Sequence, residues 1–204
     1  MLKALRILIR RRISKMNNFS EQDFAKFPIC VDLDGTLWAG DCLWLCARNF
    51  LKRYPFRFFQ LFLWWHKGRT HLKHNLLKDV SFDPKKLLFF PEILQYLFWL
   101  KEQGAKLYLV TGSDQQIADK VSGFLNIFED AFGSTLGNNL VGEKKAALLN
   151  KMFGSKKYIY FGNEWKDRLV WQHSIAAGAV NVDKKTLEWL GSQPIYTRRF
   201  ICKS

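Results

Sequence analysis

The chain has 204 residues, of which 48% are hydrophobic, 16% aromatic and 25% charged, and its formal net charge is +14. This length and composition predict one domain with a sizeable core and, at most, a small inserted subdomain. The sequence has no run of 18 or more apolar residues, so no transmembrane helix is expected. Four cysteines in a chain this long do not indicate a disulfide framework, and we expect a reducing, cytoplasmic setting.

The positive charge is concentrated in two segments. Residues 1–16 contain six Lys or Arg and residues 42–78 contain eight, and neither segment contains an acidic residue. A concentrated basic field indicates an anionic partner such as phosphates, anionic lipid or nucleic acid. The alternative is a solvated basic face that maintains solubility.

The N-terminal segment, residues 1–26, is interpreted as a basic arm. Its apolar stretch is too short for a secretory signal. As a helix it would be basic and amphipathic, which suits peripheral association with an anionic membrane surface. Its composition also fits a mitochondrial transit peptide. If Met16 is the true start, residues 1–15 have no role at all. These three interpretations stay open.

Apolar runs of strand length alternate with helical patterns along most of the chain. Strands are expected at 28–33, 105–110, 131–134, 157–161 and 176–182, and helices at about 91–103, 114–126, 143–153 and 165–173. This alternation predicts an α/β fold with a doubly wound, Rossmann-like parallel sheet. In such sheets ligands bind at the carboxyl ends of the strands, so functional residues should follow the apolar runs.

Residues 38–90 break the alternation between the first and second strands. Three helical patterns at about 39–54, 56–66 and 69–79 are divided by Pro55 and Gly68. The segment is basic and rich in Trp and Phe. We expect a helical cap over the mouth of the sheet, with a core domain of 27–37 and 91–190 and a short C-terminal tail at 191–204.

Asp32 and Asp34 follow the first apolar run, two residues apart. In an extended chain both carboxylates point to the same side and can face one pocket. Two close carboxylates repel each other, which raises one pKa or recruits a divalent cation. This division suits one ionised nucleophile and one proton donor.

The segment from Asp32 to Thr36, Asp-Leu-Asp-Gly-Thr, resembles the first motif of the haloacid dehalogenase (HAD) superfamily. In the phosphatases of that superfamily the first Asp attacks phosphorus and forms an aspartyl-phosphate. The second Asp protonates the leaving oxygen and then activates water. The resemblance therefore implies a phosphatase in which Asp32 is the nucleophile and Asp34 the acid and base.

Later strand ends carry residues that resemble two further motifs. Thr111 and Gly112 are similar to the second motif, which binds the phosphoryl oxygens; glycine also permits close approach of the backbone to an anion at a helix start. Lys144 and Lys145 resemble the third motif, the lysine that neutralises nucleophile and phosphate. The apolar pattern around Lys145 aligns better with the family.

The segment from Gly162 to Asp167 resembles the fourth motif, usually Gly-Asp-x-x-x-Asp, which implies a Mg²⁺ site. Its implied ligands are Asp32, the main-chain carbonyl of Asp34, Asn163 and Asp167. Asn163 stands where an acid is common. An amide oxygen still suits a hard cation, but the lost charge is expected to weaken metal binding.

Within the superfamily the chain looks most similar to phosphatase-like domains fused to UbiA-type prenyltransferases. The similarity rests on the aromatic basic cap, Thr-Gly-Ser-Asp after the second strand, and Gly-Asn-x-x-x-Asp followed by Leu-Val-Trp. We expect a free-standing version of such a domain. The similarity implies a phosphorylated small molecule or a lipid-linked phosphate as substrate.

Three hypotheses follow for function. The leading one is a Mg²⁺-dependent phosphohydrolase that cleaves a phosphate monoester through an aspartyl-phosphate. The alternative is a weakly active or inactive HAD-like binding or regulatory module, docked to a membrane or a membrane enzyme through its basic cap. Nucleic acid as the partner of the cap comes third, because aromatics at helical spacing more often face a core or a membrane than bases.

Overall fold

A six-stranded parallel sheet, with strand order β3-β2-β1-β4-β5-β6, forms the centre of the computed structural model. The structure describes residue 19 and residues 21–203; the expectations for residues 1–18 lie outside the described part. The strands are β1 (Ile29–Val31), β2 (Leu107–Asp114), β3 (Asp130–Ser134), β4 (Ile159–Gly162), β5 (Ala176–Val180) and β6 (Tyr196–Phe200). The doubly wound α/β fold predicted from the sequence is confirmed.

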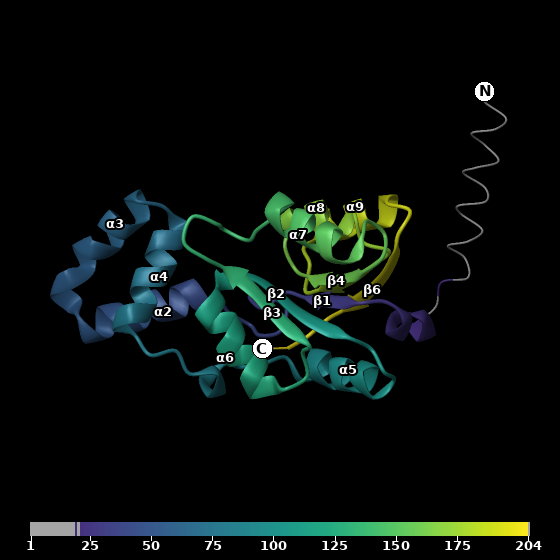
Figure 1. Cartoon of the computed structure of the whole chain (residues 1–204), viewed down its shortest axis with the longest axis horizontal. Helices are drawn as coiled ribbons and strands as arrows, with labels where there is room; N and C mark the ends of the chain where they lie inside the picture. The colour runs from purple at the N-terminus through teal and green to yellow at the C-terminus, as the bar shows by residue number, and fades with distance from the viewer. Residues whose placement is uncertain (1–18, 20, 204) are drawn as a thin grey trace, which may run out of the picture.

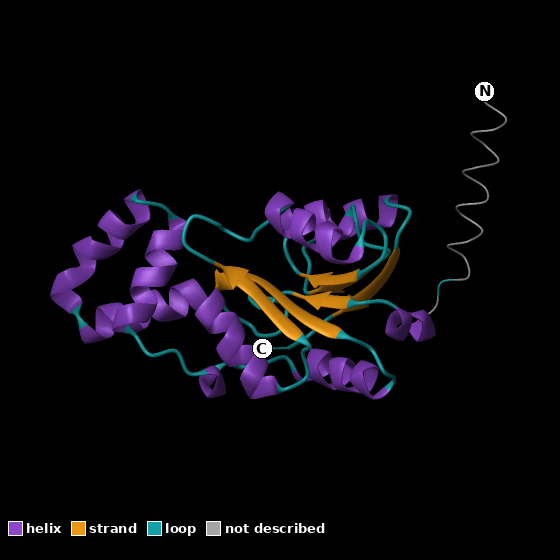
Figure 2. Cartoon of the chain, in the orientation of Figure 1, coloured by secondary structure: helices purple, strands orange, loops and turns teal. Residues whose placement is uncertain are grey.

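Helices cover both faces of the sheet (Figures 1 and 2). One face carries α5 (Pro91–Glu102) and α6 (Gln115–Leu125); the other carries α7 (Glu143–Phe153), α8 (Arg168–Trp171) and α9 (Lys184–Ser192). Successive side chains of β1 point to opposite layers: Ile29 and Val31 belong to one hydrophobic core and Cys30 to the other. A strand buried on both faces explains the uninterrupted apolar run in its sequence.

The helices between β1 and β2 form a cap at one end of the sheet (Figure 1). They are α2 (Cys42–Arg53), α3 (Phe58–His66) and α4 (Arg69–Asp79), with short 3₁₀ turns η2 (Pro55–Arg57) and η3 (Pro84–Lys86). Phe50 of α2 is fully buried and packs edge-on against Trp64 of α3, with 5.3 Å between ring centroids. The inserted helical cap predicted from the sequence is therefore present. None of the helices in the described residues is long and apolar enough to cross a membrane.

Two segments differ from the sequence expectation. The second strand was expected to end at residue 110, but β2 continues to Asp114, with a shift of register against β3 between Val110 and Asp114. Residues 191–204 were expected to be a tail, but they contain β6, which pairs with β5 along the sheet edge. Strand β6 is at the edge of the sheet, and its central residues are Thr-Arg-Arg. It therefore lacks the apolar run that marks the central strands in the sequence.

Candidate active site

The turn after β1 carries Asp32 and Asp34 to the carboxyl end of the sheet. The backbone N–H of Asp32 donates to the carbonyl of Phe161 on β4 at 3.0 Å, which fixes where the strand ends. Gly35 has φ of +71°, and a Cβ there would lie 2.1 Å from Nδ2 of Asn163. Glycine is needed at this position for the left-handed turn and for the close approach of Asn163.

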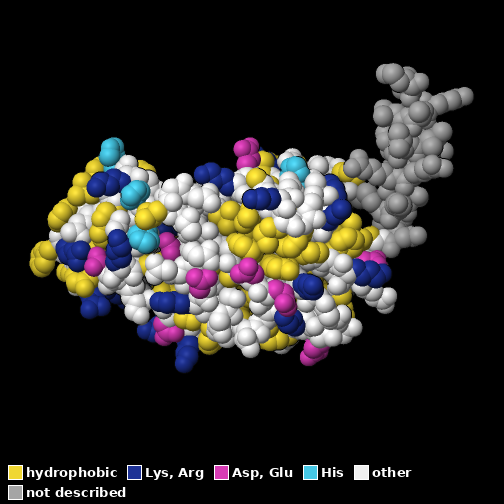
Figure 3. Space-filling view, in the orientation of Figure 1, with side chains coloured by type: hydrophobic (Ala, Val, Ile, Leu, Met, Phe, Trp, Pro, Cys, Tyr) yellow, Lys and Arg dark blue, Asp and Glu magenta, His cyan; other side chains and the backbone are white. Residues whose placement is uncertain are grey.

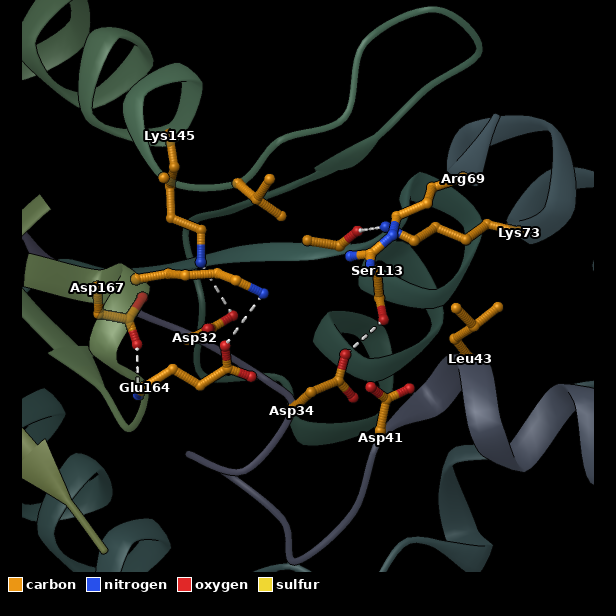
Figure 4. A pocket seen from close by; sticks show the side chains of 14 residues that line it. Asp32, Asp34, Asp41, Leu43, Arg69, Lys73, Ser113, Lys145, Glu164 and Asp167 are labelled. Carbon is orange, nitrogen blue, oxygen red and sulfur yellow. Dashed lines mark hydrogen bonds and ion pairs between the residues drawn. The ribbon is translucent and has the colours of Figure 1, made fainter. Parts of the chain in front are cut away.

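Lys145 points from the first turn of α7 toward Asp32 (Figure 4). Its Nζ lies 3.1 Å from Oδ1 of Asp32, and its side chain is only 3% exposed. The same Nζ donates to the hydroxyl of Tyr160 at 2.7 Å, and that hydroxyl donates to Oδ1 of Asp167 at 2.9 Å. Lys144, the neighbouring candidate, is exposed. Of the two lysines, Lys145 is the one that the fold brings to the carboxylates.

The pKa of Asp32 is raised to about 7. Loss of solvation on burial is the largest cause, and the charges of Asp167 and Asp34 raise the pKa further; Lys145 and the Leu33 N–H act in the opposite direction. The positive charge of Lys145 therefore does not offset burial and two neighbouring acids. The site favours an additional proton or an additional cation.

Asp34 is held by three donors. Its Oδ1 accepts from the indole Nε1–H of Trp38 at 3.0 Å and from the backbone N–H of Cys42 at 2.9 Å. Its Oδ2 accepts from the hydroxyl of Ser113 at 2.6 Å (Figure 4). Hydrogen bonds on both oxygens fix the orientation of the carboxyl group beside Asp32. The structure thus brings the two predicted aspartates together in one pocket.

Thr111 and Gly112, both predicted to bind phosphate, occupy different places. Gly112 lines the pocket together with Ser113. Thr111 is fully buried, and its Oγ1 accepts the backbone N–H of Ser113 at 3.0 Å. Thr111, Gly112 and Ser113 all belong to β2, whose register against β3 shifts between Val110 and Asp114. Ser113 belongs to the segment that resembles the second motif, but no role of its own was predicted for it from the sequence.

The segment after β4 places Asp167 in the pocket and turns Asn163 aside. Oδ2 of Asp167 accepts the backbone N–H groups of Asn163 at 3.0 Å and Glu164 at 2.9 Å. The Asn163 side chain lies against the turn at Gly35, where its Oδ1 accepts from the Thr36 hydroxyl at 3.2 Å. Glu164, which the sequence did not single out, lines the pocket.

The pocket lies between the carboxyl ends of the strands and the cap, and its volume is about 140 Å³. The cap contributes Asp41, Leu43, Arg69 and Lys73 to its wall (Figure 4). Nζ of Lys73 donates to the carbonyl of Gly112 and, at 2.8 Å, to Oδ1 of Asn139. No motif marked these four residues in the sequence; the excess of basic residues in the cap was a signal for Arg69 and Lys73 alone.

The donor atoms at this end of the sheet fit a hard divalent cation. Asp32 and Asp167 both line the pocket, and burial, together with the charges of Asp167 and Asp34, raises the pKa of Asp32. Within the described residues, no three His, Cys, Asp or Glu side chains already converge as a metal cluster. Mg²⁺ needs no such cage, because it is usually held by one or two carboxylates and keeps several waters.

Comparison with known proteins links this architecture to phosphatases. No family model matches the sequence. An uncharacterized protein, y4nM, of Sinorhizobium fredii is 32% identical over 177 residues; these cover 86% of this chain, which spans about a third (34%) of that relative's length. Among solved structures, a HAD family hydrolase, t0658, from Salmonella enterica serovar Typhi superposes with a TM-score of 0.62 at 15% identity, over 86% of this chain and 68% of that one.

A phosphoserine phosphatase, solved as a phospho-aspartyl intermediate analogue, superposes with a TM-score of 0.57 at 14% identity. The match covers 84% of this chain and 91% of the phosphatase. Sequence identities this low support a shared fold but do not establish a shared activity. The chain therefore has the HAD-like fold, a six-stranded Rossmann-like parallel sheet with a helical cap between β1 and β2, and is structurally similar to HAD phosphatases.

Proposed function

We propose that this chain is a Mg²⁺-dependent phosphohydrolase that cleaves a phosphate monoester with Asp32 as the nucleophile. The observation that carries the proposal is the contact of Asp32 with the buried Lys145, 3.1 Å apart, at the end of the central strand. A surface lysine would gain little from such a pairing, whereas a lysine buried among acids has a defined charge to balance.

The residues divide the reaction between them. An oxygen of Asp32 attacks phosphorus and forms an aspartyl-phosphate as the bond from phosphorus to the leaving oxygen breaks. Asp34 gives its proton to the leaving oxygen. It then takes a proton from the water that attacks the same phosphorus, which releases inorganic phosphate and restores the Asp32 carboxylate. Lys145 offsets the charge of Asp32 and of the incoming phosphoryl group.

The Mg²⁺ site of the proposal consists of Asp32, Asp167, the main-chain carbonyl of Asp34 and Asn163. When bound, the ion neutralises negative charge on the phosphoryl group and on Asp32. Because the Asn163 amide oxygen already accepts from Thr36, we expect Asp32 and Asp167 to supply most of the affinity. Glu164 adds negative charge at the same wall of the pocket.

The cap side of the pocket indicates the substrate class. Arg69 and Lys73 bring two cations to the wall, and Asp41 brings an acid. Such a wall suits a phosphorylated small molecule that carries further polar groups, or a lipid-linked phosphate. The second option agrees with the resemblance to phosphatase-like domains fused to UbiA-type prenyltransferases.

Hydrolysis of para-nitrophenyl phosphate with and without Mg²⁺ tests the proposal. The substitution Asp32→Asn keeps the shape of the side chain but removes the nucleophile, so turnover should fall by a factor on the order of 10⁴ or more. Asp119→Asn changes an exposed aspartate on α6 and is the matched control. Undiminished turnover in Asp32→Asn, with a normal circular dichroism spectrum, would contradict the proposal.

The second candidate is a HAD-like binding module with little activity. The position of Asn163 favours it, because the amide is directed to Gly35 and Thr36 and replaces an acid common in the family. Calorimetric titration with Mg²⁺ separates the two candidates. Binding together with Mg²⁺-dependent turnover supports the enzyme, and absence of both supports the module.

A further inference from the structure

Helix α3 lies at the end of the cap farthest from the sheet (Figure 1). It has more apolar surface than the fold buries. Its sequence is Phe-Phe-Gln-Leu-Phe-Leu-Trp-Trp-His, and none of these nine side chains, all within the described part of the chain, is buried. A helix that is apolar all round normally lies in a core or in a membrane. Here it lies on the surface.

Only one side of α3 is used to hold the cap together. Leu61 and Trp64, three residues apart and so on one helical face, pack against the hydrophobic core. The other faces and the preceding turn leave six large side chains exposed. We call these the cap tip: Phe56, Phe58, Phe59, Phe62, Leu63 and Trp65. Phe56 is 89% exposed and Phe62 is 63% exposed.

The chain around the cap tip is basic and contains no acid. Residues 42–78 carry eight Lys or Arg and no Asp or Glu. Lys52 and Arg53 at the end of α2, and Lys67 directly after α3, are exposed. Figure 3 shows hydrophobic side chains at this end of the molecule with Lys and Arg side chains around them. Contiguous exposed apolar surface bordered by charge is typical of an interaction site.

We propose that the cap tip docks this protein on the surface of an anionic lipid bilayer. Aromatic side chains suit the boundary between headgroups and acyl chains, and nearby Lys and Arg are attracted to anionic headgroups. At 1.5 Å per residue, α3 is about 13 Å long, too short to cross a bilayer, so it would lie in the interface. Asp79 pairs with Arg57 at 2.9 Å, and Lys52, Arg53 and Lys67 keep the border basic, so it is complementary to anionic lipid and not to another copy of the same basic tip. The proposal does not depend on the catalytic one.

Co-sedimentation of the full chain with vesicles tests this inference. Vesicles of phosphatidylcholine alone are compared with vesicles that also contain phosphatidylglycerol. We expect the partition coefficient to be about tenfold higher for the anionic vesicles and to fall as salt is added. Lys52→Glu combined with Lys67→Glu should reduce this preference for anionic vesicles.

A matched pair of double variants locates the docking surface. Phe62→Ser with Trp65→Ser removes two exposed side chains of the cap tip and should lower binding to anionic vesicles by about tenfold or more. Leu88→Ser with Ile201→Ser is the control, because these side chains are 74% and 69% exposed but lie outside the cap tip. The control should bind as the parent chain does.

Several results would overturn the inference. One is no vesicle binding, and another is equal binding to both vesicle types. A third is anionic binding that the cap-tip variant retains, since another basic segment would then be responsible. A fourth is concentration-dependent association in sedimentation velocity that Phe62→Ser with Trp65→Ser abolishes while vesicles are not bound, since the cap tip would then join two copies of the chain.

Discussion

The pocket at the carboxyl end of the sheet and the cap tip both contain basic and apolar residues but arrange them in opposite ways. At the sheet end, charged groups are enclosed and paired: Lys145 is 3% exposed and contacts Asp32 and Tyr160. At the cap tip, Phe56 is 89% exposed, and basic residues outnumber acids: Arg57 pairs with Asp79, while Lys52, Arg53 and Lys67 are exposed. In the pocket, charged side chains bind to other side chains of the same chain. At the cap tip, the exposed apolar side chains are available to bind another molecule.

Exchange of Lys145 should produce the largest loss after that of the nucleophile itself. In Lys145→Met the charge that offsets Asp32 is gone, so kcat should fall by roughly 10²–10³-fold. Because Lys145 lowers the pKa of Asp32, the acidic limb of the pH–rate profile should move to higher pH. Steady-state kinetics from pH 5 to 9 measure both effects.

Lys144→Met, in the adjacent residue, is the matched control and should behave as the parent chain does. An equal loss of kcat in Lys144→Met and Lys145→Met would contradict the claim that only the buried Lys145 acts on Asp32.

The two hydroxyls of the Thr-Gly-Ser segment should have different roles. Ser113→Ala removes the 2.6 Å hydrogen bond to Asp34 and should lower kcat by about tenfold. Thr111→Val leaves the Ser113 N–H without its acceptor inside the core, so it should cost about 1–3 kcal/mol in the free energy of unfolding. Kinetics and urea denaturation of both variants separate the effects; a larger kinetic loss in Thr111→Val would restore Thr111 as the phosphate-binding residue.

Lys73 links the cap to the pocket, because it reaches from α4 to Gly112 and Asn139. Lys73→Met should raise KM about fivefold to tenfold for a substrate with a second anionic group. The KM for para-nitrophenyl phosphate should change less. A purely structural role would instead raise KM equally for both substrates, together with a lower melting temperature.

The smallest expected effect is on stability. The folded pKa of Asp32, about 7, lies above the value near 3.9 of an unfolded aspartate. The folded chain therefore keeps a proton that the unfolded chain releases, and this contribution to stability falls as the pH rises from about 4 to 7. In chelator, Asp32→Asn should melt roughly 2–5 °C above the parent chain at pH 8, with a smaller difference at pH 5.

Differential scanning calorimetry at both pH values measures this effect, with Asp119→Asn as the control. A lower melting temperature for Asp32→Asn than for the parent chain at pH 8 would contradict this prediction. It would show that the ionised Asp32 carboxylate stabilises the folded chain.

The sequence predicted the place of those residues that closely follow a strand of the sheet. Asp32, Asp34 and Asp167 could be assigned to the pocket because parallel strands bring their carboxyl ends to one edge. Thr111 was harder to place, because neither the extension of β2 to Asp114 nor its shift of register has a sequence signal. Arg69 and Lys73 depend on how the cap packs over the sheet, and β6 is an edge strand without an apolar run.

Capture of the covalent intermediate tests the central claim most directly. The parent chain is mixed with para-nitrophenyl phosphate and Mg²⁺, quenched within one turnover and treated with borohydride, which reduces an aspartyl-phosphate to homoserine. Peptide mass spectrometry should find homoserine at position 32 in the parent chain and not in Asp32→Asn. Turnover without modification at position 32, or modification of another residue, would contradict Asp32 as the nucleophile.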